Sequence, residues 1–500
     1  MTTLPTEISD RDQNLSLAHG LLILWSLAAV GASLWWMYDP QAVFFAAGSL
    51  ACVTVTIPLI RRTYSVLSPW TLVVLACYVG CGLRSFAISA HLDTNTRSID
   101  ELFLLGHGPE YFVKPSLIYL IALATMTAAF MVGDAKKTAP VEGGVLIRYT
   151  FHRHLVLLAV PLAVVGLLAF VMFAQRTGGF SLDAWSIKYL RGPTSQYSGH
   201  GELRFLNNFS AAAFWVVAAS FASQRQRVNV TSARGWILGL FALNAIVMPI
   251  YVSSRTDAVF TLMFGFIIMF MIRPRRLPIR AILVGAILLA LMSAMTFLRA
   301  NAQSGNVADS APAAIKEAAA DALIYNRNFG DMETASHVIN AVPDIIPYKN
   351  GSTIITYVVA PIPRSFWRDK PVINVGPLIG YYIYGSKQTG VPPGFVGDLF
   401  LNFGFGGVLI GAALIGRLLR RFERWRIKYA DRVPVAFALL YVPTAFVFTQ
   451  NAVNKGIGAA VFNSIAQLIV MTTCLWWVGS AKSQRRVSPA QLEDPVGRPL

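Results

Sequence analysis

The chain has 500 residues, of which 55% are hydrophobic and 13% are charged, and its mean hydropathy is +0.54. An average soluble domain carries about 25% charged residues. This chain has too few to cover a surface that is entirely exposed to water, so lipid must form part of its surroundings. The net charge of +17 would suit nucleic acid, but Lys and Arg stand in short clusters between apolar runs. Such clusters are typical of membrane topology, and nucleic acid is therefore not expected as a partner.

Apolar runs long enough to cross a bilayer recur from residue 19 to residue 479. They predict an all-α polytopic integral membrane protein with about twelve transmembrane helices. The predicted spans are 19–38, 42–60, 66–88, 115–133, 155–174, 205–223, 235–252, 256–272, 280–298, 396–416, 433–450 and 457–479.

Basic residues fall on alternate connections, from Arg61 and Arg62 to the run between Arg417 and Arg432. The positive-inside rule then predicts that both termini are cytoplasmic, and every predicted span is needed to keep the alternation. The polar N-terminus lacks the basic start and the cleavage site of a signal peptide. The narrowest connection is the turn 253–257, where one long kinked element could replace two spans.

This topology predicts four regions along the chain. Residues 1–298 hold nine spans with outer loops at 89–114 and 175–204, residues 299–395 form a large outer segment, residues 396–480 hold three more spans, and residues 481–500 form a cytoplasmic tail. The large segment begins with small and polar residues, continues with an Ala-rich stretch that reads as helical, and ends in an aromatic stretch rich in Pro and Gly. Connections of this length usually have a function.

Motifs of soluble enzymes are missing from the sequence. It contains no GxxxxGK[ST], HExxH or GxSxG motif and no paired CxxC. The four cysteines lie inside apolar runs and are expected to be packed thiols. We therefore expect neither ATP-driven transport nor zinc proteolysis, and no metal or cofactor.

Arginines on the predicted outer side are the first candidates for chemistry, because topology does not require them there. They lie at span ends or in the large segment, and they are Arg84, Arg176, Arg255, Arg299, Arg327, Arg364 and Arg368. A guanidinium suits phosphate and carboxylate oxygens, so these residues predict a ligand with a lipid tail and an anionic head. The alternative is contact with ordinary lipid headgroups.

Other polar and aromatic residues of this side have two readings each. Asp398 is predicted at the start of a helix, where it either offsets the helix dipole or removes a proton from a sugar hydroxyl. His337 lies on a predicted helix and is expected to be structural. Trp367, with its aromatic neighbours, either stacks on sugars or belongs to an interfacial belt.

Three segments carry a resemblance to a known family. The stretch VPPGFVGDLFLNFGFGG, with Asp398, Asn402 and Gly404, resembles the late segment of bacterial oligosaccharide repeat-unit polymerases, the Wzy or O-antigen polymerase family. YVSSRTDAVFTL resembles the family's short Ser-Arg turn, and VVAPIPRSFWRDKP resembles its Pro-rich stretch that ends in Lys-Pro. Two departures are the Asp at position 398, where the family more often has Glu, and the missing Arg-x10-Gly loop motif.

The resemblance implies a GT-C-like, metal-independent glycosyltransferase in the bacterial inner membrane. It would move a growing glycan on undecaprenyl pyrophosphate onto a new lipid-linked repeat unit, making O-antigen, capsule or exopolysaccharide. A chain-length regulator and a flippase are the implied partners. Arg255, Arg299 and Arg364 would contact pyrophosphate, Asp398 would be the base or would position the acceptor, and Asn402 would bind substrate.

Two other functions stay open from the sequence. An O-antigen ligase or another lipid-glycan transferase would share the architecture, and a ligase would use a His of the large segment such as His337. A secondary transporter is the other, although such proteins usually carry internal repeats that this sequence does not show.

Overall fold

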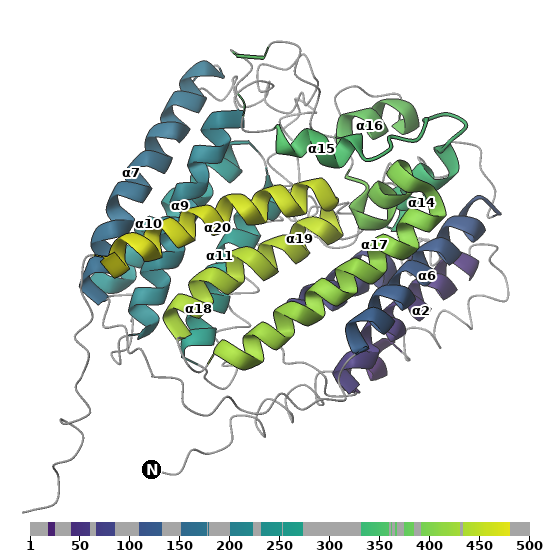
Figure 1. Ribbon diagram of the computed structural model, residues 1–500, viewed down its shortest axis with the longest axis horizontal. Helices are drawn as coiled ribbons and strands as arrows, with labels where there is room; N and C mark the ends of the chain where they lie inside the picture. Colours follow the sequence, from purple (N-terminus) through teal and green to yellow (C-terminus); the bar gives the residue numbers. More distant parts are fainter. Residues whose placement is uncertain are drawn as a thin grey trace, which may run out of the picture.

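The computed structural model describes residues 19–25, 42–60, 67–85, 110–132, 152–177, 179, 201–223, 232–252, 254–273, 332–359, 362, 366–367, 375–384, 392–430 and 434–480. Within these ranges the secondary structure is helical and contains no strand (Figure 1). The prediction of an all-helical protein is therefore confirmed for this part of the chain.

The described helices that precede the large segment are α2 (Ala42–Ile60), α3 (Trp70–Cys77) with its π-helical continuation η1 (Tyr78–Leu83), α6 (Glu110–Met131), α7 (His152–Arg176), α9 (Gly201–Ser223), α10 (Ala233–Tyr251) and α11 (Arg255–Ile272). Those that follow are α14 (Met332–Ala341), α15 (Ser352–Val358), α16 (Gly376–Tyr384), α17 (Gly394–Tyr429), α18 (Pro434–Tyr441) with the π-helical η2 (Val442–Phe446) and α19 (Val447–Asn454), and α20 (Ile457–Ser480).

Seven of the described helices are long and apolar enough to cross a membrane, and three shorter apolar helices accompany them. These ten coincide with ten of the predicted spans, and α10 and α11 are separate helices on either side of the turn at Ser254. The span predicted at 280–298 lies outside the described residues, as does most of the one at 19–38. The chain is thus a polytopic helical membrane protein.

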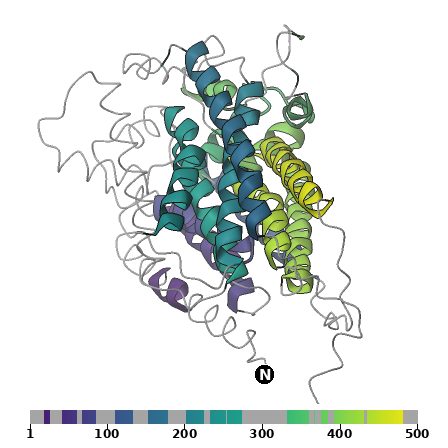
Figure 2. The same cartoon turned by 90° about the vertical axis from the view of Figure 1, so that its left-hand side faces the viewer.

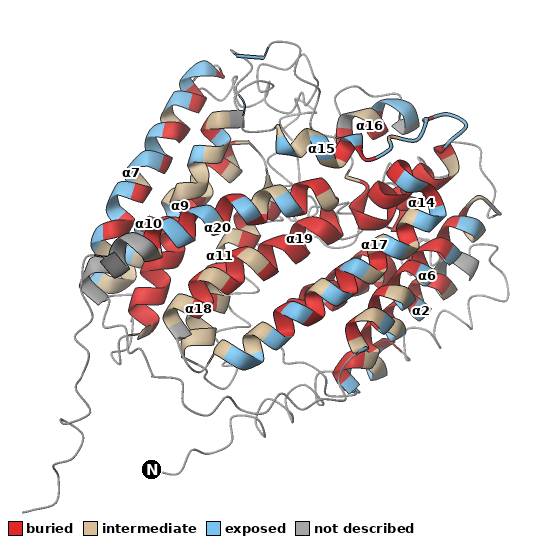
Figure 3. Ribbon diagram, in the orientation of Figure 1, coloured by how far each residue is buried: buried red, intermediate tan, exposed pale blue. Residues whose placement is uncertain are grey.

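The surface of α7 shows why lipid must surround this bundle. Seven large apolar side chains on this helix are exposed, which are Leu157, Val160, Val164, Val165, Leu167, Leu168 and Met172. Figure 3 shows the same contrast across the molecule, with exposed residues on the outward side of α7 and mostly buried ones along α19. An apolar face of this size facing outward is expected where acyl chains replace water.

Small residues bring the long helices close together. A Cβ at Gly416 of α17 would lie 2.2 Å from the backbone oxygen of Met126 of α6, and one at Gly166 of α7 would lie 2.0 Å from Ser210 Oγ of α9. Asn244 of α10 donates hydrogen bonds to Ala163 O and Ser210 Oγ, each at 3.2 Å. Close packing of small residues and interhelical hydrogen bonds drive association where water is absent.

The helices run side by side (Figure 2), so that the bundle has two distinct ends. We call the end where α19 and α20 are joined the hairpin end. Arg176 at the end of α7 lies 3.7 Å from Glu202 at the start of α9, and Lys455 contacts the start of α11, so these termini share the hairpin end. At the opposite end Arg417 of α17 bonds Val132 O after α6.

Candidate functional site at the hairpin end

The turn between α10 and α11 carries the first group of polar residues. Ser254 Oγ donates a hydrogen bond to Asp257 Oδ2 at 2.6 Å, and Arg255 is the first residue of α11. The structure describes the backbone of Arg255 and not its side chain. Asp257 in the first turn of α11 offsets the helix dipole, whereas Ser254 makes no side-chain cap to the helix N–H groups and donates to this carboxylate instead.

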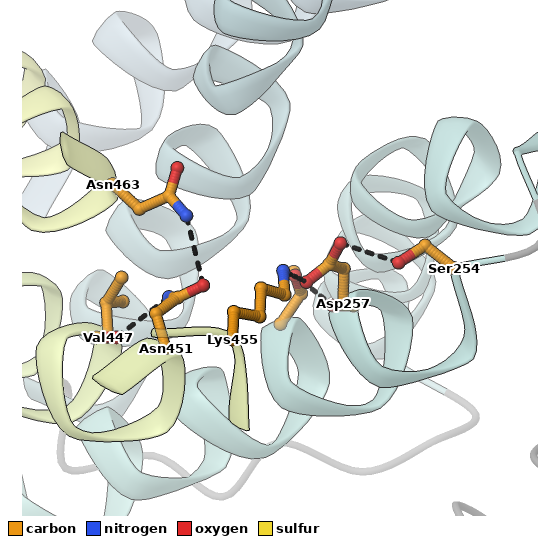
Figure 4. A network of polar contacts seen from close by, with 7 residues as sticks. Ser254, Asp257, Val447, Asn451, Lys455 and Asn463 are labelled. Atoms are coloured by element: carbon orange, nitrogen blue, oxygen red, sulfur yellow. Dashed lines mark hydrogen bonds and ion pairs between the residues drawn. The ribbon is translucent and has the colours of Figure 1, made fainter. Parts of the chain in front are cut away.

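A lysine from the other half of the chain meets this turn. Lys455 Nζ lies 2.7 Å from Asp257 Oδ1, and Figure 4 shows the two side chains reaching toward each other from α19 and α11. Both side chains are partly exposed, Lys455 at 32% and Asp257 at 43%. Asp257 therefore holds a lysine and a serine at once, in a place that water can reach.

The hairpin that presents Lys455 is braced from within. Lys455 N donates to Asn451 O at 2.7 Å, which ends α19, and Asn463 Nδ2 donates to Asn451 Oδ1 at 3.0 Å, which ties α19 to α20 (Figure 4). Gly456 has a φ of 126°, a conformation that a residue with a side chain rarely adopts. The short connection thus fixes where the lysine stem begins.

Asp398 holds the other side of the same hairpin. Its Oδ2 accepts a hydrogen bond from Ile457 N, at the start of α20, at 2.8 Å. Its Oδ1 accepts from Thr353 Oγ1 at 2.9 Å and from Asn402 Nδ2 at 3.1 Å. Asp398 is 4% exposed and lies one turn inside α17, not at its very start as predicted. The dipole that it offsets is that of α20.

Asn402 completes this network by joining α17 to the turn before α15. Its Oδ1 accepts from Gly351 N at 2.9 Å, and its Nδ2 donates to Thr353 Oγ1 at 2.6 Å. Asn402 is fully buried, so its amide supports the backbone around it. The next turn of α17 is broken at Gly404, where φ is 62°.

Tyr357 of α15 lies against the same network. Its ring packs on Gly458, where a Cβ would come within 2.3 Å of the ring, and its centroid is 6.3 Å from that of Phe462. Burial, together with the charge of Asp398, raises the pKa of Tyr357 above its ordinary value, so this phenol stays protonated at neutral pH.

Two contacts join α14 to the rest of the bundle: Arg84 binds Glu333 of this helix, and His337 of this helix lies against α6. Arg84 Nε donates to Glu333 Oε2 at 2.8 Å, and both side chains of this ion pair are buried. His337 Nδ1 lies 3.2 Å from Tyr111 Oη of α6, and His337 is buried as well. These contacts dock the large segment on the bundle, and the structure gives Arg84 a protein partner where the sequence indicated an anionic ligand.

The remaining predicted residues are spread out. Arg176 is half exposed and pairs with Glu202, and Trp367 is 41% exposed in the stretch after α15. Arg299, Arg327, Arg364 and Arg368 lie outside the described residues. The structure thus brings together the Ser254–Asp257 turn, Asp398 and Asn402, through a hairpin that the sequence analysis did not single out.

Lys455 and Thr353 are the members of this site that sequence reasoning missed. Lys455 is the only basic residue in the connection 451–456 between the last two spans, and this was a signal that could have been found. Thr353 offers no such signal, because only the fold brings it to Asp398, 45 residues away in the chain.

Among the described residues, no group of three or more His, Cys, Asp and Glu side chains stands close enough to hold a metal ion. Comparisons with protein-family models, with curated proteins and with solved structures give no match to this chain.

Proposed function

We propose that this chain polymerises lipid-linked oligosaccharide repeat units in the inner membrane of a bacterium. The observation that supports the proposal most is the meeting of the Ser254–Asp257 turn and the Asp398 segment on one hairpin. These are two of the three segments that resemble repeat-unit polymerases, and they are about 140 residues apart in the sequence. The proposal keeps the GT-C-like architecture of about twelve spans.

The distribution of charge supports a site on the non-cytoplasmic side. The basic residues of α17 gather toward its C-terminal half, with Arg426 and Lys428 in the last turn, at the end of the bundle away from the hairpin. Under the positive-inside rule that end faces the cytoplasm, and both chain termini do so too. The hairpin end then faces the periplasm, where lipid-linked repeat units are joined.

The reaction that we propose is a single transfer. A hydroxyl oxygen of the acceptor glycan bonds to the anomeric carbon of the donor glycan, and the bond from that carbon to the pyrophosphate breaks. The hydroxyl proton passes to an exposed carboxylate or to water, and the lipid pyrophosphate leaves with the bonding electron pair. Cationic side chains at the hairpin end, with Arg255 first among them, stabilise the charge that develops on the leaving group.

The experiment is a comparison of surface glycans in a strain that lacks the gene. Wild type should restore a ladder of chain lengths, whereas Arg255→Ala should leave single repeat units. Arg273→Ala is the matched control, because it changes an arginine at the other end of the same helix and should restore the ladder. Membrane expression of each variant is checked by immunoblot.

Other outcomes separate the alternatives. Long chains that stay unattached to the lipid core in the deletion strain would indicate a ligase. An unchanged glycan profile in that strain would contradict any role in glycan assembly and would leave the transporter to be tested.

A further inference from the structure

We propose that Lys455 binds the pyrophosphate of the lipid-linked donor, and that Asp257 occupies Lys455 between turnovers and gives way to the pyrophosphate. This inference rests on the proposed function, since it names the group at that site which takes the anionic head of the substrate. It concerns a residue that no sequence motif indicated.

The position of Lys455 is the first argument. It follows α19 directly, and its backbone is fixed by Asn451 O on one side, while Gly456 lies against Asp398 on the other. A Cβ at Gly456 would lie 2.8 Å from Asp398 Oδ2, which shows how closely the carboxylate seats the hairpin. A cation on a fixed backbone loses less entropy on binding than one on a free loop.

The state of the ion pair is the second argument. The contact between Lys455 Nζ and Asp257 Oδ1 is short, at 2.7 Å, yet both side chains are partly exposed. Water weakens such a pair, so replacing the carboxylate by another anion costs little free energy. A pyrophosphate carries more charge and more acceptor oxygens than a carboxylate, and it therefore competes well for the ammonium group.

The hold on Asp257 is the third argument. Ser254 Oγ donates to Asp257 Oδ2 at 2.6 Å, and the helix start lies beside it, so the carboxylate stays in place when the lysine leaves. Asp257 can then take back Lys455 as soon as the product departs. This arrangement favours release of the lipid pyrophosphate, which a permanently free lysine would retain.

The contrast with another ion pair makes the case specific. Arg426 and Glu423 form a pair at 2.9 Å near the opposite end of α17, but Glu423 there is fully buried. An anion from solution cannot replace a carboxylate that solvent does not reach. Lys455–Asp257 combines exposure with a place on the hairpin itself, whereas Arg176–Glu202, another exposed pair at this end, joins α7 to α9 at a longer distance of 3.7 Å.

The test measures binding of farnesyl pyrophosphate to the full-length protein in nanodiscs of phosphatidylcholine, by isothermal titration calorimetry. Lys455→Ala should weaken binding about tenfold, the effect of one charge-assisted hydrogen bond. Lys455→Arg should bind within about threefold of wild type, because the charge is kept. Asp257→Asn should tighten binding about threefold, since the competing charge is gone and Ser254 keeps an acceptor.

Two controls complete the experiment. Lys428→Ala, which removes an exposed lysine at the other end of α17, should bind as wild type does. Farnesol should bind more weakly than farnesyl pyrophosphate to wild type, and Lys455→Ala should not change its affinity.

The outcomes separate this inference from the proposed function. Unchanged binding by Lys455→Ala, or weaker binding by Asp257→Asn, would overturn the role of Lys455 even where the glycan ladder depends on the gene. Binding that depends on Lys455, in a protein whose loss leaves the glycan profile unchanged, would keep the anion site and overturn the polymerase.

Discussion

Asp398 illustrates how a residue can be found from sequence while its partners cannot. An acid next to a Pro-Gly stretch at the start of an apolar run stands out, and the structure does place it at the site. Its partners could not be predicted, because Thr353 and Ile457 lie 45 and 59 residues away. With donors on both oxygens and almost no exposure, Asp398 is built to hold the hairpin more than to accept a proton.

This role predicts what substitution of Asp398 should do. Asp398→Ala leaves the Ile457 N–H and the Thr353 hydroxyl without their acceptor, and each buried donor without a partner destabilises a protein by about 1–3 kcal/mol. The thermal transition in detergent should fall accordingly, and Asp398→Asn should lower it less.

The pH dependence of transfer separates a brace from a base. With Asp398→Asn, we expect a lower rate at every pH and an unchanged acidic limb in the pH profile. Loss of that limb alone, with stability kept, would instead show that Asp398 removes the proton.

At the scale of elements, the hairpin between α19 and α20 is constrained at Gly456. Gly456 combines a φ of 126° with close contact to Asp398, so a side chain at this position is strained and also lacks space. The sequence shows only a glycine between two apolar runs, which is common at any helix end. The close contact of Gly456 with Asp398 arises from tertiary packing, which the sequence does not show.

We therefore expect Gly456→Ala to move Lys455 and to weaken binding of farnesyl pyrophosphate several-fold. Gly406→Ala is the matched control, because a Cβ there meets nothing within 4 Å in a helical stretch of α17. Calorimetry of both variants checks the prediction, after their thermal transitions have been shown to be equal. Equal affinity of the two variants would mean that the hairpin does not position the lysine.

The docking of α14 is a second lesson at this scale. The sequence indicates a helix in this region from its alanines, and the structure has one from Met332 to Ala341. What the pattern did not show is that almost every residue of this helix is buried against the bundle. The buried pair of Arg84 and Glu333 is part of this contact, and an ion pair out of water persists only when both partners stay in place.

At the scale of the whole molecule, hydropathy alone predicted most of the membrane-spanning helices that the structure describes. Ten predicted spans became apolar helices because a bilayer leaves few other ways to satisfy a backbone. How these helices pack was not readable, since small residues such as Gly166 and Gly416 occur throughout an apolar sequence. That packing also places Asp257 and Asp398 on opposite sides of the hairpin that carries Lys455.

The orientation of the bundle is testable with two single-cysteine variants. The native cysteines Cys52, Cys77, Cys81 and Cys474 form no disulfide and are buried, so they should give little background. Val358→Cys at the hairpin end and Ile427→Cys at the other end replace exposed apolar side chains, 75% and 55% exposed respectively.

In cells with a permeabilised outer membrane, an impermeant maleimide should label Val358→Cys alone. Both variants should be labelled after the inner membrane is disrupted. Labelling of Ile427→Cys alone in intact cells would reverse the topology and would place the site in the cytoplasm.

The break in α17 also bears on which residues share the apolar interior of the bilayer. The helix has 36 residues, which at 1.5 Å per residue would exceed the roughly 30 Å of a hydrocarbon core by a wide margin. Basic residues begin at Arg417, so only about 12 residues, roughly 18 Å of helix, separate the break at Gly404 from the charged part of α17. These residues are too few to cross the core alone, so the turns that carry Asp398 and Asn402 extend into it. Polar side chains at that depth need partners from the protein itself, and the hydrogen bonds from Ile457 N and Gly351 N provide them.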